Sequence, residues 1–358
     1  MQTIAILGAG AGGTAAAVEL QAKGHEVRLW NRSAQTLEPL RRIGGVEYEG
    51  VLGEGRISIA RIDSDLKTIV DGADAALVCL PTFTHGAIAR DLAAIGFERP
   101  IVLNPGHTGG ALEFRHAWLS VARRAPELAE FSTLTYVARK QEARVRISGV
   151  ARQVRVGALP GADAAMEAAR RMYPSASPVQ SVLVSDLSNA NLVLHPPAAV
   201  LGAAWIEATG GDFTFYVQGA TPGVGRVMGA LDRERQAVAA AFGYAVEPLV
   251  EEMRAIGTVE PDTEPGADIV QAISGGAANR RIKAPDSFAH RYYREDFGFG
   301  LVPFAELAAI AGVPVPTADA LLTLASGMTG EDYRRSGRNA QRMGIAGLTL
   351  AGLKQLVS

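Results

Sequence analysis

The sequence predicts an α/β fold, a Rossmann-type doubly wound sheet followed by an all-α domain. A GxGxxG pattern, at Gly8, Gly10 and Gly13, directly follows the first apolar run. Short β-rich runs alternate with helical stretches through the first half, which is typical of a mostly parallel sheet wrapped by helices. The second half consists of alanine- and leucine-rich segments with helical spacing. We therefore expect a dinucleotide-binding domain over residues 1–184 and a helical substrate domain over residues 185–358.

The composition is that of a globular protein with no strong charge bias. The chain has 358 residues, enough for two domains, with 48% hydrophobic and 20% charged residues. Lys plus Arg (35) nearly balances Asp plus Glu (37), so nothing favours nucleic acid or an acidic membrane as a partner. The single cysteine, Cys79, fits a reducing compartment, and we expect a cytoplasmic protein. The start lacks the basic segment of a signal peptide and is better interpreted as a strand and a turn.

The first domain is expected to contain four parallel strands and several later additions. The four strands are predicted at 3–8, 26–31, 75–81 and 100–106. Three further runs follow with few helical residues between them, and we expect them to form hairpin additions at the sheet edge: 132–138, 144–149 and 153–159. A helix at 164–174 and a strand at 179–185 complete the domain.

The second domain is expected to be mostly helical. Its predicted helices lie at 189–208, 225–242, 248–256, 303–311, 318–328 and in the tail after residue 331.

The glycine turn predicts a dinucleotide site. The first glycine permits the tight turn, the second lets a pyrophosphate approach the backbone, and the third packs helix on strand. At the end of the second strand, Asn31, Arg32 and Ser33 replace the acidic residue that would hold an unphosphorylated ribose. A guanidinium can bind a 2′-phosphate, so NADP(H) is favoured over NAD(H). The alternative is that Arg32 is a solvated loop residue.

Further cofactor contacts are expected at the carboxyl ends of later strands, where ligands bind in such sheets. The candidates are Leu80, Pro81 and Asn104. Ordinary turns are the alternative interpretation of these glycine- and proline-rich loops.

His195 is the candidate proton carrier of the helical domain. It lies within an almost wholly apolar stretch and is followed by Pro196 and Pro197. A lone histidine in such a run is usually a core residue, and the two prolines either open the helix or kink it. Histidines and acidic residues do not cluster at metal-ligand spacing, so no metal is proposed.

Over essentially the whole chain, the sequence resembles the opine dehydrogenases, the octopine/nopaline dehydrogenase family. The resemblance rests on the glycine turn and on the segments NPGHTGGALEF, NANLVLHPPAAVLGAAWIE and RYYREDFGFGLVPFAELAAIAGVPVPTADALLTLA. Within this family, the sequence most resembles the bacterial N-(1-D-carboxyethyl)-L-norvaline dehydrogenase type. It implies an architecture like that of 6-phosphogluconate dehydrogenase and an NAD(P)H-dependent reductive condensation of an α-keto acid with the amino group of an L-amino acid.

The resemblance also implies the site residues. The catalytic histidine of the family falls on His195, its aspartate partner on Asp296, and the arginine for the keto acid carboxylate in the segment of Arg291. Such a histidine exchanges protons near neutral pH, and a carboxylate on its other ring nitrogen fixes the tautomer. His107, in a glycine-rich loop, and Asn191 are further substrate-binding candidates.

Two other functions remain open from the sequence. Ketopantoate reductase and glycerol-3-phosphate dehydrogenase resemble the amino half equally well, although those families use a lysine where this helix has His195. A sensor that binds NADP(H) without chemistry would need no histidine and aspartate pair. Helical domains of this kind often carry dimer contacts, so a homodimer is one possible assembly.

Overall fold

The computed structural model describes the whole chain except residues 265 and 278, and it divides into two compact units. The first unit comprises residues 1–106 and 114–182, and the second comprises residues 107–113 and 183–358. The chain therefore crosses between the units at Val182 and Leu183. The short segment 107–113 belongs with the helical unit, which the sequence did not indicate.

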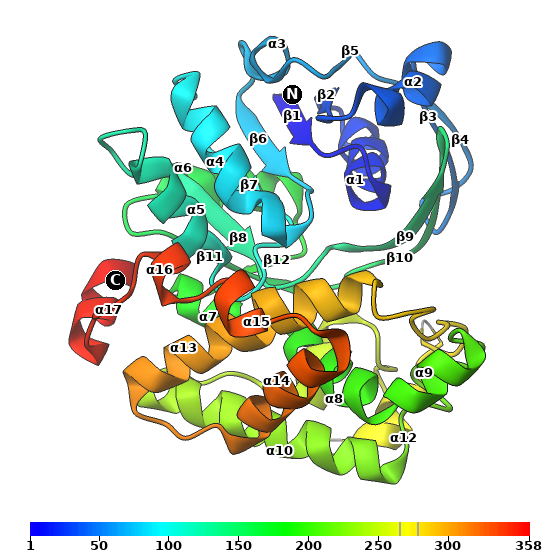
Figure 1. Ribbon diagram of the computed structural model, residues 1–358. Coiled ribbons are helices and arrows are strands. Elements are labelled where there is room, and N and C mark those ends of the chain that lie inside the picture. Colours follow the sequence, from blue (N-terminus) through cyan, green and yellow to red (C-terminus); the bar gives the residue numbers. More distant parts are fainter. Residues whose placement is uncertain (265, 278) are drawn as a thin grey trace. The chain divides into compact units, whose positions relative to one another are not determined.

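An eight-stranded sheet forms the centre of the first unit (Figure 1). Its order is β12-β11-β8-β7-β6-β1-β2-β5, and all neighbours are parallel except β8 and β11. The strands are β1 (Thr3–Leu7), β2 (Glu26–Trp30), β5 (Arg61–Asp63), β6 (Ala75–Val78), β7 (Ile101–Leu103), β8 (Leu128–Phe131), β11 (Val154–Ala158) and β12 (Ala176–Pro178).

The central strands form where the sequence has continuous apolar runs. All residues of β6 and β7, and Ile4 to Leu7 of β1, are buried. Strands covered by helices on both faces lose the alternation of apolar and polar residues, because both sides of each strand must be apolar. The four parallel strands predicted from these runs are present.

Helices complete the first unit. They are α1 (Ala11–Ala22), α2 (Ala34–Ile43), α3 (Leu66–Val70), α4 (His85–Ala94), α5 (Gly110–Leu119), which begins in the segment 107–113, and α6 (Asp163–Met172), with a 3-10 turn η1 at Thr82–Thr84. Helix α1 packs on β1 and β2 and also on strands of a second sheet, so it is covered on two sides (Figure 1).

The second sheet corrects part of the prediction for the added strands. It has the order β4-β3-β10-β9, with β3 (Gly45–Gly50), β4 (Gly55–Ser58), β9 (Tyr136–Gln141) and β10 (Arg144–Val150). The sequence predicted that all three added runs extend the main sheet. Only β11 does so, pairing antiparallel with β8, whereas β9 and β10 form a hairpin whose partner is β3.

The last strand and helix of the unit also differ from the prediction. The run 179–185 was predicted as a strand, but β12 ends at Pro178 and α7 (Val182–Leu187) begins within this run. Val182, Leu183 and Leu187 are buried. The small helical penalty of valine is outweighed by this burial.

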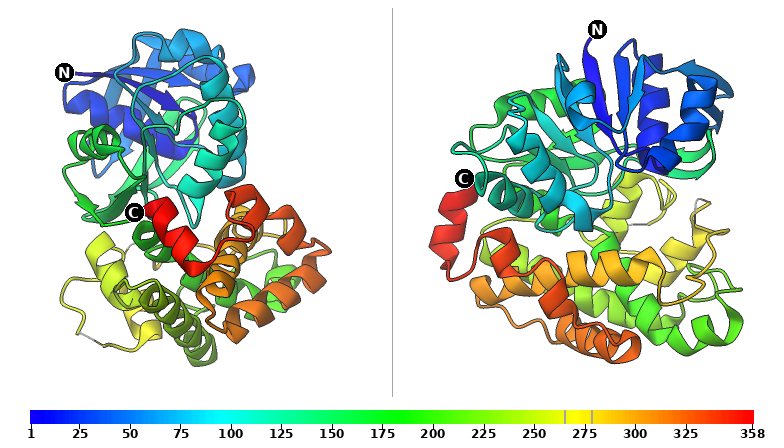
Figure 2. Two further views of the ribbon diagram at one scale, coloured as in Figure 1. Left: turned by 90° about the vertical axis from the view of Figure 1, so that its left-hand side faces the viewer. Right: turned by 45° about the horizontal axis from the view of Figure 1, so that its top comes forward.

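The second unit is built almost entirely of helices, which Figure 2 shows from two further sides in green through red. They are α8 (Asn191–Leu201), α9 (Ala203–Thr209), α10 (Pro222–Ala241), α11 (Leu249–Ile256), α12 (Ile269–Gly275), the π-helix η2 (Tyr293–Leu301), α13 (Val302–Ala311), α14 (Pro316–Thr329), α15 (Tyr333–Ser336), α16 (Ala340–Met343) and α17 (Leu350–Val357). The π-helix was not predicted. In the described part of the chain, every helix is too short or too polar to cross a membrane.

Candidate active site

Helix α8 holds His195 inside the helical unit. The helix is apolar on all sides, and its residues from Leu192 to Val200 are buried, as expected for a helix with no solvent face. Pro196 and Pro197 lie within it, and the helix continues to Leu201. The two prolines cannot donate to the carbonyls of Leu192 and Val193, but the helix is not broken.

His195 is bonded to Asp296 of η2. The imidazole Nδ1 lies 2.8 Å from Asp296 Oδ2, and both residues are buried, with exposed fractions of 4% and 2%. A carboxylate only accepts hydrogen bonds, so Nδ1 carries a proton and donates it to Asp296. The lone pair of the neutral imidazole is therefore on Nε2, which can accept a hydrogen bond or a proton.

Two tyrosines also contact this imidazole. The Tyr216 hydroxyl lies 2.7 Å from His195 Nε2. The Tyr292 ring stacks on the imidazole, with centroids 3.8 Å apart and planes 16° from parallel. Tyr216 and Tyr292 are both buried. Neither tyrosine was predicted. Tyr292 lies in the family-like segment that contains Asp296, but nothing in the sequence links Tyr216 to the histidine.

His107 lies on the other side of Asp296. Its Nε2 is 3.7 Å from Asp296 Oδ1, and its Nδ1 is 3.1 Å from Asn189 Nδ2. The Asn189 Oδ1 accepts from the Asn191 backbone N–H, so Nδ2 is the donor to His107. Burial lowers the pKa of His107 to about 4, and the opposing attraction of Asp296 does not compensate for it. His107 is therefore a neutral imidazole at pH 7 with its proton on Nε2.

Charged side chains flank the dyad on η2 and just before it. The Arg291 side chain is exposed. Desolvation by the surrounding protein atoms lowers its pKa, but the attraction of the Glu295 and Asp296 carboxylates outweighs this effect and raises the pKa above its ordinary value. Burial raises the pKa of Glu295 to about 6, against the attraction of Arg291. Arg291 is a permanent cation close to the acidic residues of the site. Asn191 is the first residue of α8 and lies one turn before His195.

The glycine turn of the first unit has the shape that a dinucleotide requires. Gly8 has φ +123°, and a Cβ there would lie 2.3 Å from the Cys79 carbonyl oxygen. A Cβ on Gly13 would lie 1.7 Å from the Gly8 oxygen, whereas one on Gly10 would meet nothing within 4 Å. Gly8 and Gly13 are thus required by packing, and Gly10 leaves open space at the N-terminus of α1. These residues fit a pyrophosphate on the helix N-terminus.

The loop after β2 borders the glycine turn. Asn31 Oδ1 accepts a hydrogen bond from the Ala9 N–H at 3.3 Å, and Ser33 Oγ caps α2 by accepting from Thr36 N. Arg32 between them is exposed, and its guanidinium has no hydrogen bond or ion pair with any described residue. Two of the three predicted residues therefore shape the loop, while the arginine is available to a ligand.

The other predicted cofactor contacts differ in their exposure. Leu80 is half-buried and Pro81 is exposed after β6. Asn104 is fully buried, and its amide bonds Thr135 Oγ1, Tyr173 Oη and the Thr135 backbone N–H at 2.9, 3.3 and 3.2 Å. These bonds fix the loop after β7 and leave the Asn104 side chain no exposed surface.

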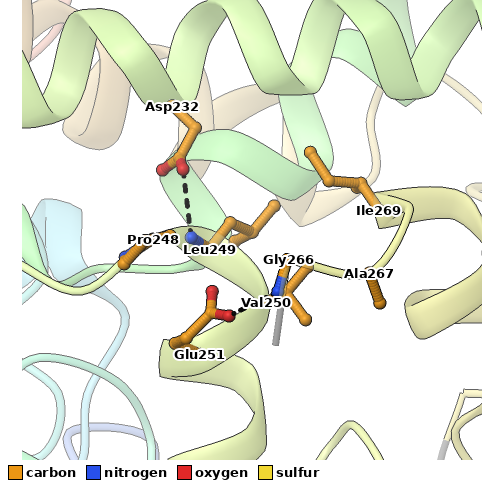
Figure 3. Close-up of a pocket in the computed structure, with 8 residues that line it drawn as sticks. All are labelled: Asp232, Pro248, Leu249, Val250, Glu251, Gly266, Ala267 and Ile269. Atoms are coloured by element: carbon orange, nitrogen blue, oxygen red, sulfur yellow. Dashed lines mark hydrogen bonds between the residues drawn. The ribbon is translucent and has the colours of Figure 1, made fainter. Parts of the chain in front are cut away.

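A cavity of about 120 Å³ lies elsewhere in the helical unit (Figure 3). Asp232 and Glu251 line it, and their carboxylates accept hydrogen bonds from the backbone N–H groups of Leu249 and Gly266. Asp232 also pairs with the buried Arg235. The cavity contains no residue of the dyad, and its polar groups are engaged in holding the chain.

A glycine-turn sheet and a buried histidine and aspartate pair in a helical unit define an NAD(P)-dependent dehydrogenase. Residues 178–329 match the family described as NAD/NADP octopine/nopaline dehydrogenase, alpha-helical domain, and residues 3–105 match the NAD-dependent glycerol-3-phosphate dehydrogenase N-terminus. An opine dehydrogenase of Arthrobacter sp. (strain 1C) is 34% identical, over 99% of each chain. The chain belongs to the opine dehydrogenase family.

Other relatives agree with this assignment. Octopine dehydrogenase of Mizuhopecten yessoensis is 22% identical over 80% of this chain and 78% of its own. A solved octopine dehydrogenase in complex with NADH and agmatine has the same fold, with a TM-score of 0.81, 20% identity and coverage of 99% and 98%. An NADP+-bound yersinopine dehydrogenase has a TM-score of 0.73 at 16% identity, covering 96% and 97%.

The protein is therefore an NAD(P)H-dependent oxidoreductase acting on CH–NH bonds, and its reaction is the opine-type reductive condensation. The glycerol-3-phosphate dehydrogenase match covers only the dinucleotide-binding half, so the alternative of that reductase group is less supported than the opine reaction.

Proposed function

We propose that His195 and Asp296 are the catalytic dyad, and that the substrates are an α-keto acid such as pyruvate and an L-amino acid. The observation that carries the proposal is the buried bond of 2.8 Å between His195 Nδ1 and Asp296 Oδ2. It leaves Nε2 as the only ring nitrogen that can exchange protons, and a buried carboxylate stabilises the imidazolium that forms. Solved octopine dehydrogenases with L-arginine and with pyruvate support these substrate classes.

In this proposal His195 acts first as a base and then as an acid. It takes up the proton that the ammonium group of the amino acid loses. The amine then adds to the keto carbon, a proton moves from the nitrogen to the keto oxygen, and a neutral carbinolamine forms. The imidazolium then returns this proton to the carbinolamine hydroxyl, the C–O bond breaks, and water leaves as the C=N bond forms. NAD(P)H, when bound, supplies the hydride that reduces this carbon. One proton is taken and returned, so the dyad ends as it began.

We assign the remaining site residues to binding. Arg291 holds the keto acid carboxylate, because an arginine fork matches two carboxylate oxygens. His107 and Asn191 contact the substrates, His107 as a neutral hydrogen-bond donor. Gly8, Gly10 and Gly13 hold the pyrophosphate, and the remaining cofactor contacts are Asn31, Arg32, Ser33, Leu80 and Pro81. Asn104, also expected to be a contact, acts through the loop after β7 that its buried side chain fixes.

We also propose that the protein prefers NADP(H) over NAD(H). Arg32 carries this preference, because it is exposed, cationic and has no partner among the described residues. A 2′-phosphate would supply the partner.

The protein would act in the cytoplasm, for which the single Cys79 gives the support, and as a homodimer, which sedimentation of the purified protein would test.

The proposed reaction is tested by following NADPH oxidation with pyruvate and a panel of L-amino acids. Oxidation should require both substrates, and mass spectrometry should find a secondary amine dicarboxylate. His195→Ala should abolish the reaction while NADPH binding persists. Oxidation that needs the keto acid but no amine would contradict the proposal.

A further inference from the structure

We propose that the Tyr216 hydroxyl, rather than the imidazole itself, exchanges the proton with the substrate, as the outer end of an Asp296–His195–Tyr216 relay. The inference rests on the proposed dyad and adds a catalytic residue to it.

The first observation is that the imidazole has no free nitrogen. Nδ1 is bonded to Asp296 Oδ2 at 2.8 Å, and Nε2 to Tyr216 Oη at 2.7 Å. Since Nδ1 carries the ring proton, Nε2 accepts from the phenol in the neutral state and donates to it as imidazolium. The phenol oxygen is thus in contact with the nitrogen that must exchange protons, at a distance suited to transfer.

The second observation is that the phenol keeps its own proton. Burial raises the pKa of Tyr216 well above its ordinary value, and the neighbouring Tyr292 phenol and Asp296 carboxylate add to this. The nearby Arg291 opposes it. A neutral phenol has one donor and two acceptor positions, so it can take a proton from Nε2 while passing its own outward.

The third observation is that Tyr216 is held in place. It lies in a turn whose start, Thr214, accepts backbone bonds from Gln218 and Gly219 and donates to the Gln218 side chain. The adjacent Phe215 N–H is bonded to the Ile282 carbonyl oxygen. The buried ring also contacts Phe215 edge-on, with centroids 5.2 Å apart. These contacts hold the hydroxyl against Nε2, as a relay requires. They argue against a Tyr216 side chain that moves away from Nε2 when the substrate binds.

The relay conserves atoms and charge. During dehydration of the carbinolamine, Tyr216 donates its proton to the leaving hydroxyl while its oxygen takes the Nε2 proton of the imidazolium. The C–O bond breaks, the nitrogen lone pair forms the C=N bond, and water departs. The products are a neutral histidine, a neutral tyrosine and a positively charged iminium, so one positive charge is present before and after. The same two transfers run in reverse when the amine is deprotonated.

Tyr216→Phe tests the relay, with Tyr293→Phe as the matched control. Tyr293 is a buried tyrosine of the same unit, and its hydroxyl donates to the Ala199 carbonyl of α8 at 3.0 Å rather than to His195. We expect Tyr216→Phe to lower kcat at least about a hundredfold, as for loss of a positioned acid, with unchanged NADPH binding. Tyr293→Phe should stay within about twofold of the wild-type kcat, well below that range.

The alternative is that the phenol only occupies Nε2 until substrate displaces it. In that case Tyr216→Phe would retain or raise kcat and lower the keto acid KM, which would overturn the relay. His195→Ala measured in parallel separates the two proposals. If His195→Ala is inactive and Tyr216→Phe is not, the relay fails and the dyad stands. If His195→Ala is active, the dyad itself fails.

A second measurement needs no variant and so does not depend on the folding of Tyr216→Phe. The kcat of the wild-type protein is measured in mixtures of H2O and D2O. A relay moves two protons in one step, so kcat should fall along a curve as the deuterium fraction rises. A straight line would mean that one proton moves, from the imidazole directly to the substrate, and would overturn the relay.

Discussion

Asp296 Oδ2 lies 2.8 Å from His195 Nδ1 although 101 positions separate the two residues in the chain. The pair is buried in the helical unit, where α8 packs directly on η2. Both residues have almost no exposed surface, so their mutual bond and the bond from Tyr216 determine where the imidazole proton resides. Since the three side chains are one hydrogen-bonded group, their substitutions should not act independently.

We expect His195→Ala and Asp296→Asn each to lower kcat at least about a hundredfold, the range for a positioned acid or base. The double variant should be little worse than His195→Ala alone, because groups that act as a unit are strongly non-additive. Asp319→Asn, which changes an exposed aspartate of the same unit, is the control. Losses that multiply in the double variant would argue against a dyad.

The glycines of the turn should separate folding from cofactor binding. Gly10→Ala places a methyl group in open space, so thermal stability should be kept while the NADPH Kd rises about tenfold or more, the equivalent of 1.4 kcal/mol. Gly13→Ala places it 1.7 Å from the Gly8 oxygen and should lower the free energy of unfolding by about 1–3 kcal/mol. Calorimetry and NADPH titration measure the two effects.

Gly12→Ala is the control within the same turn, because its Cβ would meet only the flexible tip of Leu134, at 3.0 Å. It should lower stability less than Gly13→Ala and raise the NADPH Kd less than Gly10→Ala. If Gly10→Ala left the NADPH Kd unchanged, this turn would not be the pyrophosphate site.

The strands that the sequence predicted are those whose signal is local. The continuous apolar runs of β1, β6 and β7 have one interpretation, since both faces of these strands are buried. Strand β3 is half-exposed and polar, and its partner β10 lies about a hundred residues later, with Glu47 opposite Arg144. Nothing near β3 in the sequence indicates that β10 is its partner, so the pairing that joins the β3–β4 and β9–β10 hairpins into a second sheet was missed.

The same distinction separates the parts of the candidate site. The glycine turn follows a fixed spacing, and His195 and Asp296 lie in segments that resemble a known family. Tyr216 and Tyr292 reach the imidazole because three chain segments pack together. Tyr216 lies in a turn, where no pattern distinguishes it from a core residue, and Tyr292 directly precedes η2 with no feature that marks it as a contact of His195. Only the folded structure identifies these contacts.

The cofactor preference should depend on Arg32. We expect kcat/KM to favour NADPH over NADH by at least about tenfold, the scale of one charge-assisted contact. Arg32→Ala should remove most of this preference, while Arg42→Ala, an exposed arginine at the far end of α2, should keep it. Equal or better use of NADH by the wild-type protein would refute the preference for NADP(H).

Arg291→Lys should act on the keto acid alone. Lysine keeps the positive charge but loses the planar fork, so the keto acid KM should rise about tenfold, a loss of roughly 1.4 kcal/mol. The NADPH Kd should stay unchanged, because the glycine turn belongs to the other unit. Arg294→Lys, an exposed arginine three residues later, is the control. If the keto acid KM and the NADPH Kd rise together, Arg291 has a structural role instead.

The buried His107 should make stability depend on pH. Its pKa is about 4 in the folded protein and near 6.5 when unfolded, so between these values the unfolded state binds more protons. The free energy of unfolding should therefore fall as the pH is lowered from 6.5 to 4, by at most about 3 kcal/mol from this residue. Glu295 acts with the opposite sign. Because its pKa is raised to about 6, the folded state binds more protons than the unfolded state above pH 4.5, so this residue raises the free energy of unfolding as the pH is lowered from about 6 to 4.5.

Urea denaturation at several pH values between 4 and 7 measures this dependence. His107→Asn should make stability fall less steeply toward acid pH, because it removes the histidine and leaves the contribution of Glu295. Asparagine is the suitable replacement, since it tolerates the φ of +63° at this position. His116→Asn, which replaces an exposed histidine on α5, is the control. If His107→Asn and wild type lost stability equally between pH 6.5 and 4, His107 would exchange protons alike in both states, and the interpretation of His107 as a buried neutral donor would be wrong.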